Sequence, residues 1–267
     1  FNERTDLPAE LYSLDILDGS PPCSTFSMAG SREKAWGKEK QFREGQSLQT
    51  LDDLVFVYCD TIAKLKPKVF LLENVKGIIQ GNAKWYSKQI VTRMEAHGYK
   101  VQVFCLNAAS MGVPQKRERV FFIGHKKEFN LPRLLLRFQE KAVTFGEVRD
   151  KSETKQDLTV VQKGLWDRQK PSDKTLADVR EKANGFTDNL IGDKDVCPTI
   201  TSGGKFLCKD KPRWFNKQEF CQCGTYPLDY NFIDLEAQYL IGMSVPPVAM
   251  AQISLEIYKQ WLSKCVP

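Results

Sequence analysis

Three kinds of side chain in this sequence could do chemistry together. Cys23 follows two prolines, and a thiolate is an effective nucleophile. Glu73 follows an apolar run, and a carboxyl group can exchange a proton with a reacting atom. Arg117 and Arg119 are spaced by two, so on a strand they would share a face and could stabilise negative charge in one site. Brought into one site, these residue types would allow a nucleophile to act beside groups that stabilise negative charge.

Predicted strands position these side chains. We expect strands over 13–17, 69–72, 100–106 and 119–123, the last two at the edge of the sheet. The first is expected to be buried. Gly19 then allows a turn, and the prolines stiffen the approach to Cys23. Because open α/β sheets bind ligands at the carboxyl ends of their strands, Cys23 and Glu73 are placed where chemistry is expected.

Helical periodicity predicts three helices around these strands. They are expected over 47–66, ended by Pro67, over 84–97, stopped by Gly98, and from Pro246 and Pro247 onward. Taken singly, the chemical residues have ordinary explanations as well. Cys23 could be an incidental buried cysteine, and the carboxylate and amide at 73–74 could form a turn at a strand end.

Four stretches in one order change that balance. They are Pro22-Cys23, Glu73-Asn74-Val75, Gln115 to Arg119 in a Gln-x-Arg-x-Arg pattern, and Ser244-Val245. In this order they closely resemble the motifs of the DNA cytosine-5 methyltransferase family. The resemblance runs from about Asp15 to about Gln260 and is weak in the middle third. Four ordered motifs at suitable spacing are hard to obtain by chance.

The resemblance implies a fold class and a division into domains. The fold is expected to be α/β, with the Rossmann-like sheet of an S-adenosylmethionine-dependent methyltransferase, here lacking its first strands, and an inserted smaller target-recognition domain. The expected division is 1–129 for the first part of the catalytic domain, 130–235 for target recognition, and 236–267 for the returning C-terminal helix.

The resemblance also implies a reaction on cytosine. Cys23 would add to C6 of the base, Glu73 would hydrogen-bond or protonate N3, and Arg119, helped by Arg117, would hold O2. The activated C5 would then accept a methyl group from S-adenosylmethionine. Because the target base is stacked inside a duplex, it would have to be flipped out.

Further contacts carry over from the family motifs. The cofactor-binding positions would be Pro22, Leu54, Ser244 and Val245. The positions near double-stranded DNA would be Ser27, Gln115, Thr199, Thr201, Gly203 and Gly204. No metal is expected: Cys208, Cys221 and Cys223 lack the usual zinc spacing and a fourth ligand, so they read as ordinary thiols.

Two departures from the family pattern are visible. Met243 stands where the family has an asparagine that braces the nucleophile loop. In addition, the glycine-rich turn and the acidic residues that hold the cofactor would lie before Phe1. We therefore expect a complementary N-terminal segment or subunit as a partner, and weak cofactor binding without it.

Composition sets broader bounds. The 267 residues include 39 basic and 33 acidic side chains, and a net charge of +6 permits an anionic partner without requiring one. No apolar run approaches the ~20 residues of a membrane span, and no signal peptide opens the chain. The eight cysteines are irregularly spaced, which suits a reducing compartment. We expect a bacterial cytoplasmic or nucleoid-associated protein.

Three other functions stay open at this point. Amino-methyltransferases also carry paired prolines after a strand, but they rely on an aromatic residue where this chain has Cys23. A related family methylates cytosine in tRNA with the same motifs. A non-catalytic DNA-binding half of a split or truncated methyltransferase would retain the nucleophile and lack most of the cofactor site.

Overall fold

The computed structural model describes residues 1–22, 39–40, 49–50, 54–152, 158–180 and 188–265. The chain divides into two compact units, each considered separately below. The first contains Phe1–Leu106, Glu118–Leu136 and Leu255–Pro267, and the second contains Asn107–Arg117 and Arg137–Ser254.

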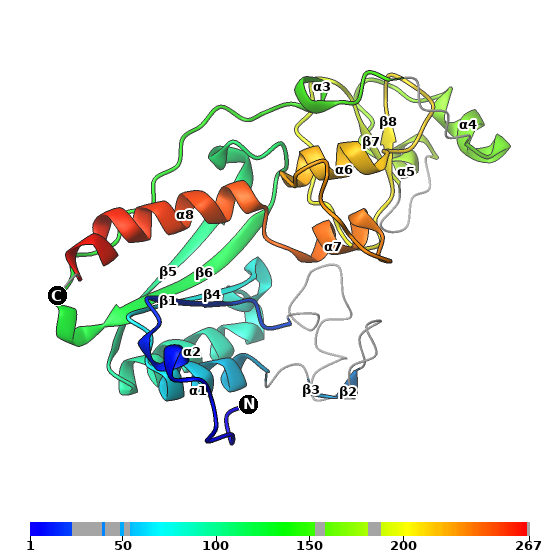
Figure 1. Cartoon of the computed structure of the whole chain (residues 1–267). Coiled ribbons are helices and arrows are strands. Elements are labelled where there is room, and N and C mark those ends of the chain that lie inside the picture. The colour runs from blue at the N-terminus through cyan, green and yellow to red at the C-terminus, as the bar shows by residue number, and fades with distance from the viewer. Residues whose placement is uncertain (23–38, 41–48, 51–53, 153–157, 181–187, 266–267) are drawn as a thin grey trace. The chain divides into compact units, whose positions relative to one another are not determined.

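The first unit is built on a four-stranded mixed sheet in the order β1-β4-β6-β5 (Figure 1). Its strands are β1 (Ile16–Gly19), β4 (Val69–Val75), β5 (Tyr99–Asn107) and β6 (Glu118–Lys126). Strand β1 runs parallel to β4, and β6 runs antiparallel to β4. β6 lies between β4 and β5, so the prediction that it is an edge strand was wrong. Its sequence is continuously apolar from Val120 to Ile123 because both faces are buried.

Helices α1 (Leu54–Leu65) and α2 (Lys84–Ala96) cover one face of this sheet. Their apolar stripes pack on alternate residues of β4 and β6, including Phe70, Leu72 and Phe122. On the opposite face Trp261 packs edge-on against His125, with ring centroids 4.7 Å apart, and its indole N–H donates to the carbonyl of Pro132. The β4 run is therefore apolar because it is covered on both sides.

The beginning of the unit differs from the sequence predictions. The 3₁₀ helix η1 (Ala9–Ser13) includes the first residue of the predicted strand, and β1 begins three residues later, at Ile16. This strand is half-buried because it pairs with one described neighbour. Gly19 ends β1 and makes no left-handed turn: a Cβ there would come within 2.4 Å of the Tyr58 ring. Close packing explains this glycine.

The helix predicted over 47–66 begins later than expected. A short antiparallel pair, β2 (Glu39–Lys40) and β3 (Gln49–Thr50), takes up part of that range, and α1 starts at Leu54. Its end agrees with the prediction, since Lys66 adopts a positive φ of 50° before Pro67. The helix predicted over 84–97 is confirmed as α2. Besides η1, the described part of this unit contains the 3₁₀ helices η4 (Lys76–Ile79), η5 (Gly81–Ala83), η7 (Lys127–Phe129) and η8 (Leu262–Lys264).

The second unit combines short helices and irregular segments with a small parallel strand pair, β7 (Asn189–Ile191) and β8 (Phe206–Cys208). Its other elements are η6 (Ala108–Met111), α3 (Phe145–Val148), α4 (Val160–Trp166), α5 (Leu176–Val179), α6 (Lys217–Gly224), α7 (Ala237–Met243) and α8 (Pro247–Gln260), whose last turns belong to the first unit. The predicted start of the C-terminal helix is confirmed.

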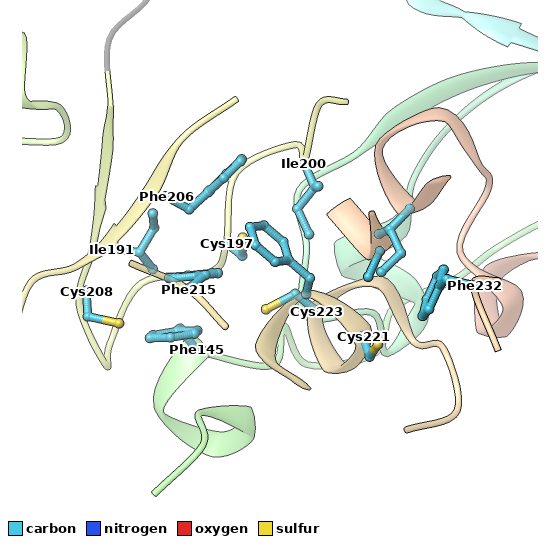
Figure 2. Close-up of a cluster of buried hydrophobic side chains, with 13 residues drawn as sticks. Phe145, Ile191, Cys197, Ile200, Phe206, Cys208, Phe215, Cys221, Cys223 and Phe232 are labelled. Carbon is cyan, nitrogen blue, oxygen red and sulfur yellow. The ribbon is translucent and has the colours of Figure 1, made fainter. Parts of the chain in front are cut away.

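A cluster of aromatic and sulfur-containing side chains forms the core of this unit (Figure 2). Phe145 stacks on Phe215 with ring centroids 4.4 Å apart and an interplanar angle of 5°. Cys208 is buried in the cluster, and burial raises its pKa to about 12, so its thiol stays protonated near neutral pH. Among the described residues no group of three or more His, Cys, Asp or Glu side chains is arranged to hold a metal ion.

The compact units divide the chain differently from the predicted domains. The second unit includes α7, which packs on α6 through Ile241, and it continues to Ser254 instead of ending at 235. It also includes Asn107–Arg117. The target-recognition role of 130–235 stays a prediction.

The C-terminal helical stretch Ala237–Lys264 is long and apolar enough, by length and composition alone, to cross a membrane. The core helix of a globular protein passes the same test. Here Ile253, Ile257 and Trp261 are fully buried within the protein. The stretch is also divided into α7, α8 and η8.

Candidate active site

The exit of β1 is fixed by side chains from α1 and β4. The Tyr58 hydroxyl lies 3.0 Å from the carbonyl oxygens of both Leu17 and Leu71, and its ring packs against Gly19. The amide of Asn74 donates to the carbonyl oxygen of Pro21 at 3.3 Å. Burial raises the pKa of Tyr58 well above its usual range, so the hydroxyl remains a donor. The backbone that leads to Pro22 is therefore held on two sides.

Glu73 and Arg119 meet on one face of the sheet. Residue 73 pairs with Phe121 and Val75 pairs with Arg119, so the antiparallel register sets the two side chains diagonally across β4 and β6. Arg119 Nε lies 3.1 Å from Glu73 Oε1, and the two side chains are only 16% and 10% exposed. Arg119 also donates from Nη1 to the carbonyl of Glu118 at 2.8 Å. The arrangement orients a carboxylate beside a cation at the carboxyl end of β4.

Pro22 is the last described residue before the predicted nucleophile. It is half-buried, as is Leu54, which opens α1. Cys23 and Ser27 lie outside the described residues. Their catalytic and DNA-binding roles stay predictions that rest on the sequence motif.

Gln115 and Arg117 make their contacts within the second unit. Arg117 is 2% exposed and donates from Nη1 to the carbonyl of Ile200 and from Nη2 to the carbonyl of Gly242, each at 2.9 Å. The Gln115 side chain accepts from the Ile200 N–H at 3.1 Å and donates to the carbonyl of Cys223 at 3.2 Å. Strand β6 begins at Glu118, after both residues. Arg117 thus holds backbone, whereas Arg119 contacts a carboxylate in the first unit.

The predicted DNA-facing positions follow this anchored backbone. Thr199 donates from its hydroxyl to the carbonyl of Lys116 at 2.6 Å. Thr201 and Gly204 are half-buried, and Gly203 between them is exposed. The segment therefore has fixed ends and an accessible tip, which suits contact with a large ligand.

Ser244 and Val245, the other predicted cofactor contacts, follow α7. Both are half-buried, and the Ser244 hydroxyl donates to the carbonyl of Ile241 at 3.1 Å. The Ser244 hydroxyl can also accept a hydrogen bond, and Val245 is apolar, as Pro22 and Leu54 of the first unit are. Each side chain, taken by itself, has the chemical character of a contact to a polar or apolar part of an adenosine-containing cofactor. The cofactor-binding residues themselves stay predictions.

Comparison with known proteins decides the family. A family model described as C-5 cytosine-specific DNA methylase matches residues 1–259. The chain belongs to this family. The predicted membership is confirmed.

Individual relatives agree with this membership. The Type II methyltransferase M.Bsp6I of a Bacillus species is 30% identical over 273 residues, covering 95% of this chain and 81% of the relative. The Type II methyltransferase M.DdeI of Desulfomicrobium norvegicum is 35% identical over 162 residues, covering 60% of this chain but only 36% of the relative. M.AplI of Arthrospira platensis is matched over 30% of its length. The chain thus aligns with about a third of these last two proteins.

A solved structure shows the same fold. The DNMT2 structure from Spodoptera frugiperda has a TM-score of 0.59 at 15% identity and covers 91% of this chain and 79% of that chain. At this identity the likeness establishes the fold alone. It confirms the predicted α/β methyltransferase fold class.

Two residues in the site region were missed by sequence reasoning. Tyr58 is one, because helical periodicity places it on α1 but cannot show that its hydroxyl reaches two strand carbonyls. Gln238 was not singled out at all. Its side-chain amide binds the carbonyl of Thr201 at 3.2 Å and also the carbonyl of Gly204, which are 37 and 34 residues away in sequence.

Proposed function

We propose that this chain transfers a methyl group from S-adenosylmethionine to C5 of cytosine in duplex DNA. The observation that carries the proposal is the Glu73–Arg119 ion pair at the carboxyl end of β4, in a chain whose family is C-5 cytosine-specific DNA methylase. The names of its relatives, Type II methyltransferases, support DNA modification of the kind found in restriction-modification systems.

The reaction follows from three side chains. The Cys23 thiolate adds to C6, and the electron pair of the C5–C6 double bond moves into the ring. Glu73 hydrogen-bonds or protonates N3, while Arg119 holds O2, so negative charge is stabilised as it develops. The Glu73–Arg119 contact fixes the position of both groups before the base arrives. This preorganisation is the contribution of β4 and β6.

The remaining steps regenerate the free thiol. When bound, S-adenosylmethionine supplies an electrophilic methyl group, and the activated C5 takes it. Loss of the C5 proton to a base or to water restores the double bond, and the Cys23 Sγ–C6 bond breaks. Since C6 is inaccessible in a stacked base pair, the cytosine has to leave the duplex.

A covalent trap tests the nucleophile. In a duplex made by polymerase chain reaction with 5-fluorodeoxycytidine triphosphate, the fluorine cannot leave as a proton does, so the adduct persists on a denaturing gel. The adduct should form with S-adenosylmethionine and should disappear in Cys23→Ser, because a serine hydroxyl is far less ionised than a thiol. Cys105→Ser, at an exposed cysteine of β5, is the matched control and should retain it. An adduct that survives Cys23→Ser would refute the assignment.

Glu73→Gln tests the acid separately. The substitution preserves size and should slow methyl transfer by roughly 10²–10⁴-fold, the usual contribution of a positioned acid or base. Near-normal turnover in a folded variant would exclude the proposed role of this carboxyl group.

We further propose that a complementary N-terminal segment or subunit completes the cofactor site. Within the described part of the chain, β1 pairs with β4 on one side and with no strand on its other side. We expect the 267 residues alone to bind S-adenosylmethionine weakly, and the affinity to rise when the further strands are supplied. Isothermal titration decides this: micromolar affinity of the chain alone would contradict it. A cytoplasmic or nucleoid location belongs to the same proposal.

The tRNA alternative requires a direct comparison. Methyl transfer from tritiated S-adenosylmethionine should label duplex DNA and leave tRNA unlabelled at equal cytosine concentration. Preferential labelling of tRNA would reverse the assignment. If neither nucleic acid is labelled but duplex DNA binds, the chain is a DNA-binding half of a methyltransferase.

A further inference from the structure

We infer that Gln238 is a positioning residue that sets the conformation of the Thr201–Gly204 turn and thereby the sequence specificity of methylation. The inference rests on the proposed function, because it takes duplex DNA as the substrate. It assigns a role to a residue outside the four sequence motifs. The contacts that support it all lie within the second unit.

The side-chain amide of Gln238 connects the two ends of the turn. The residue is half-buried near the start of α7. Its Nε2 donates to the carbonyl of Thr201 at 3.2 Å and to the carbonyl of Gly204. The Gly204 N–H also reaches the carbonyl of Thr201, at 3.4 Å. A long backbone hydrogen bond is thus reinforced by an amide that binds both of the carbonyls beside it.

The other end of α7 packs against the same turn. A Cβ at Gly242 would lie 2.3 Å from the backbone nitrogen of Ser202, so only a glycine allows this approach. The carbonyl of Gly242 in turn accepts from Arg117, whose guanidinium also holds Ile200, the residue that precedes the turn. The backbone from 200 to 204 is consequently fixed by α7 at two points and by Arg117 at a third.

The tip of the turn is left free for a ligand. Ser202 and Gly203 are exposed, and Lys205 beyond them is also exposed, with its ammonium group 5.7 Å from the centroid of the Trp214 ring. A hydroxyl, exposed backbone groups and a cation are suited to contacts with base edges and phosphate. Contacts of this kind discriminate between bases only if the donor and acceptor atoms are held within a fraction of an ångström. Gln238 provides that restraint.

Two substitutions test the restraint in the full 267-residue chain. Gln238→Ala removes the donor, and Gln238→Glu keeps the size but places carboxylate oxygens opposite two carbonyl oxygens. Glu236→Ala is the matched control, since Glu236 is exposed at the N-cap of the same helix and makes no side-chain cap hydrogen bond. All four proteins methylate a plasmid of known sequence, and bisulfite sequencing gives the rate at the preferred site and at sites that differ by one base pair.

The expected result separates specificity from chemistry. Both Gln238 variants should lower the ratio of kcat/KM at preferred and single-mismatch sites by roughly tenfold, the lower end of what one good base contact discriminates. The kcat for methylation at the preferred site should change by less than about threefold, because Cys23 and Glu73 are not substituted. Glu236→Ala should match the unmodified protein. An unchanged ratio in folded Gln238 variants would overturn the inference.

Hydrogen–deuterium exchange provides a reading that does not need activity. Peptides covering residues 199–206 should exchange faster in both Gln238 variants than in the unmodified protein or in Glu236→Ala. Exchange in β4 and β6 should be unchanged in all four. If the unmodified protein methylates no plasmid cytosine even at saturating S-adenosylmethionine, the proposed function fails, and the exchange comparison still decides the positioning role. Equal exchange over 199–206 in all four proteins would overturn it.

Discussion

Arg117→Lys and Arg119→Lys make the same chemical change two residues apart, and we expect them to affect different properties. The Arg117 guanidinium binds two carbonyl oxygens through different nitrogens, each at 2.9 Å, in a site that is 2% exposed. A lysine ammonium is a single point of charge and cannot reproduce this fork. At least one charge-assisted hydrogen bond is lost, which corresponds to about 1.5–3 kcal/mol of unfolding free energy.

Arg119 presents the opposite case. Its described partners are the carboxylate of Glu73, 3.1 Å from Nε, and the carbonyl of the adjacent Glu118, and a lysine keeps a positive charge beside the carboxylate. We therefore expect Arg119→Lys to change the free energy of unfolding by about 1 kcal/mol or less. The loss of a fixed donor to cytosine O2 should instead lower kcat by roughly 10²–10³-fold, as removal of one donor to a developing anion does.

Urea unfolding and methyl-transfer rates measured on the same preparations test both statements. Circular dichroism and tryptophan fluorescence should first be shown to give coincident transitions, because two compact units need not unfold together. Activity is then compared at a temperature where every variant is folded. If Arg119→Lys destabilises the protein more than Arg117→Lys, or if folded Arg117→Lys loses activity as severely as Arg119→Lys, the assignment of Arg117 to backbone positioning is wrong.

Three further substitutions have defined outcomes. Tyr58→Phe removes the hydroxyl shared by two strand carbonyls and should lower the unfolding free energy by about 1 kcal/mol in thermal or urea unfolding, and no change would mean that the contact is replaced by water. Met243→Asn should change the free energy of unfolding by no more than ~0.5 kcal/mol, because Met243 is 45% exposed. The rate of methyl transfer should be unchanged or slightly higher, and a large loss of activity would show that the last motif is misaligned. Burial lowers the pKa of His125 below the usual 6.5, so the unfolded chain takes up a proton first as the pH falls, and stability should decrease below about pH 6.5. In His125→Phe the urea midpoint should lose that part of its pH dependence, and an unaltered pH profile would show that His125 is not responsible.

The parts of the fold that sequence predicted well have strong local signals. β4 is a continuous apolar run, α2 has a glycine directly after its last turn, and α8 opens with paired prolines. Where the prediction was wrong, a contact distant in sequence decided the structure. Gln49–Thr50 pairs with a two-residue strand, too short to show alternation, and therefore α1 starts late. Gly19 suggested a turn because the Tyr58 ring beneath it is 39 positions away.

The candidate site was predictable only as a set of motifs. Glu73 and Arg119 are 46 positions apart, and periodicity cannot show that antiparallel pairing of β4 with β6 brings them into contact. The resemblance to cytosine-5 methyltransferases supplied that relation. It could not supply Gln238, because an amide that binds two backbone carbonyls leaves no pattern in a sequence. Local rules find strands and caps, whereas long-range polar contacts require coordinates.

The Gln-x-Arg-x-Arg spacing is explained by where β6 begins. Side chains two apart would share a face if all three residues were in the strand, but the strand starts at Glu118, so the alternation applies to Arg119 and not to Gln115 or Arg117. The first two residues bind the backbone around Ile200 in the second unit, and the third contacts Glu73 in the first. The peptide 115–119 therefore has two roles. Its first residues hold the backbone that leads into the predicted DNA-facing turn, and its last residue contacts Glu73, the carboxylate proposed to bind cytosine N3.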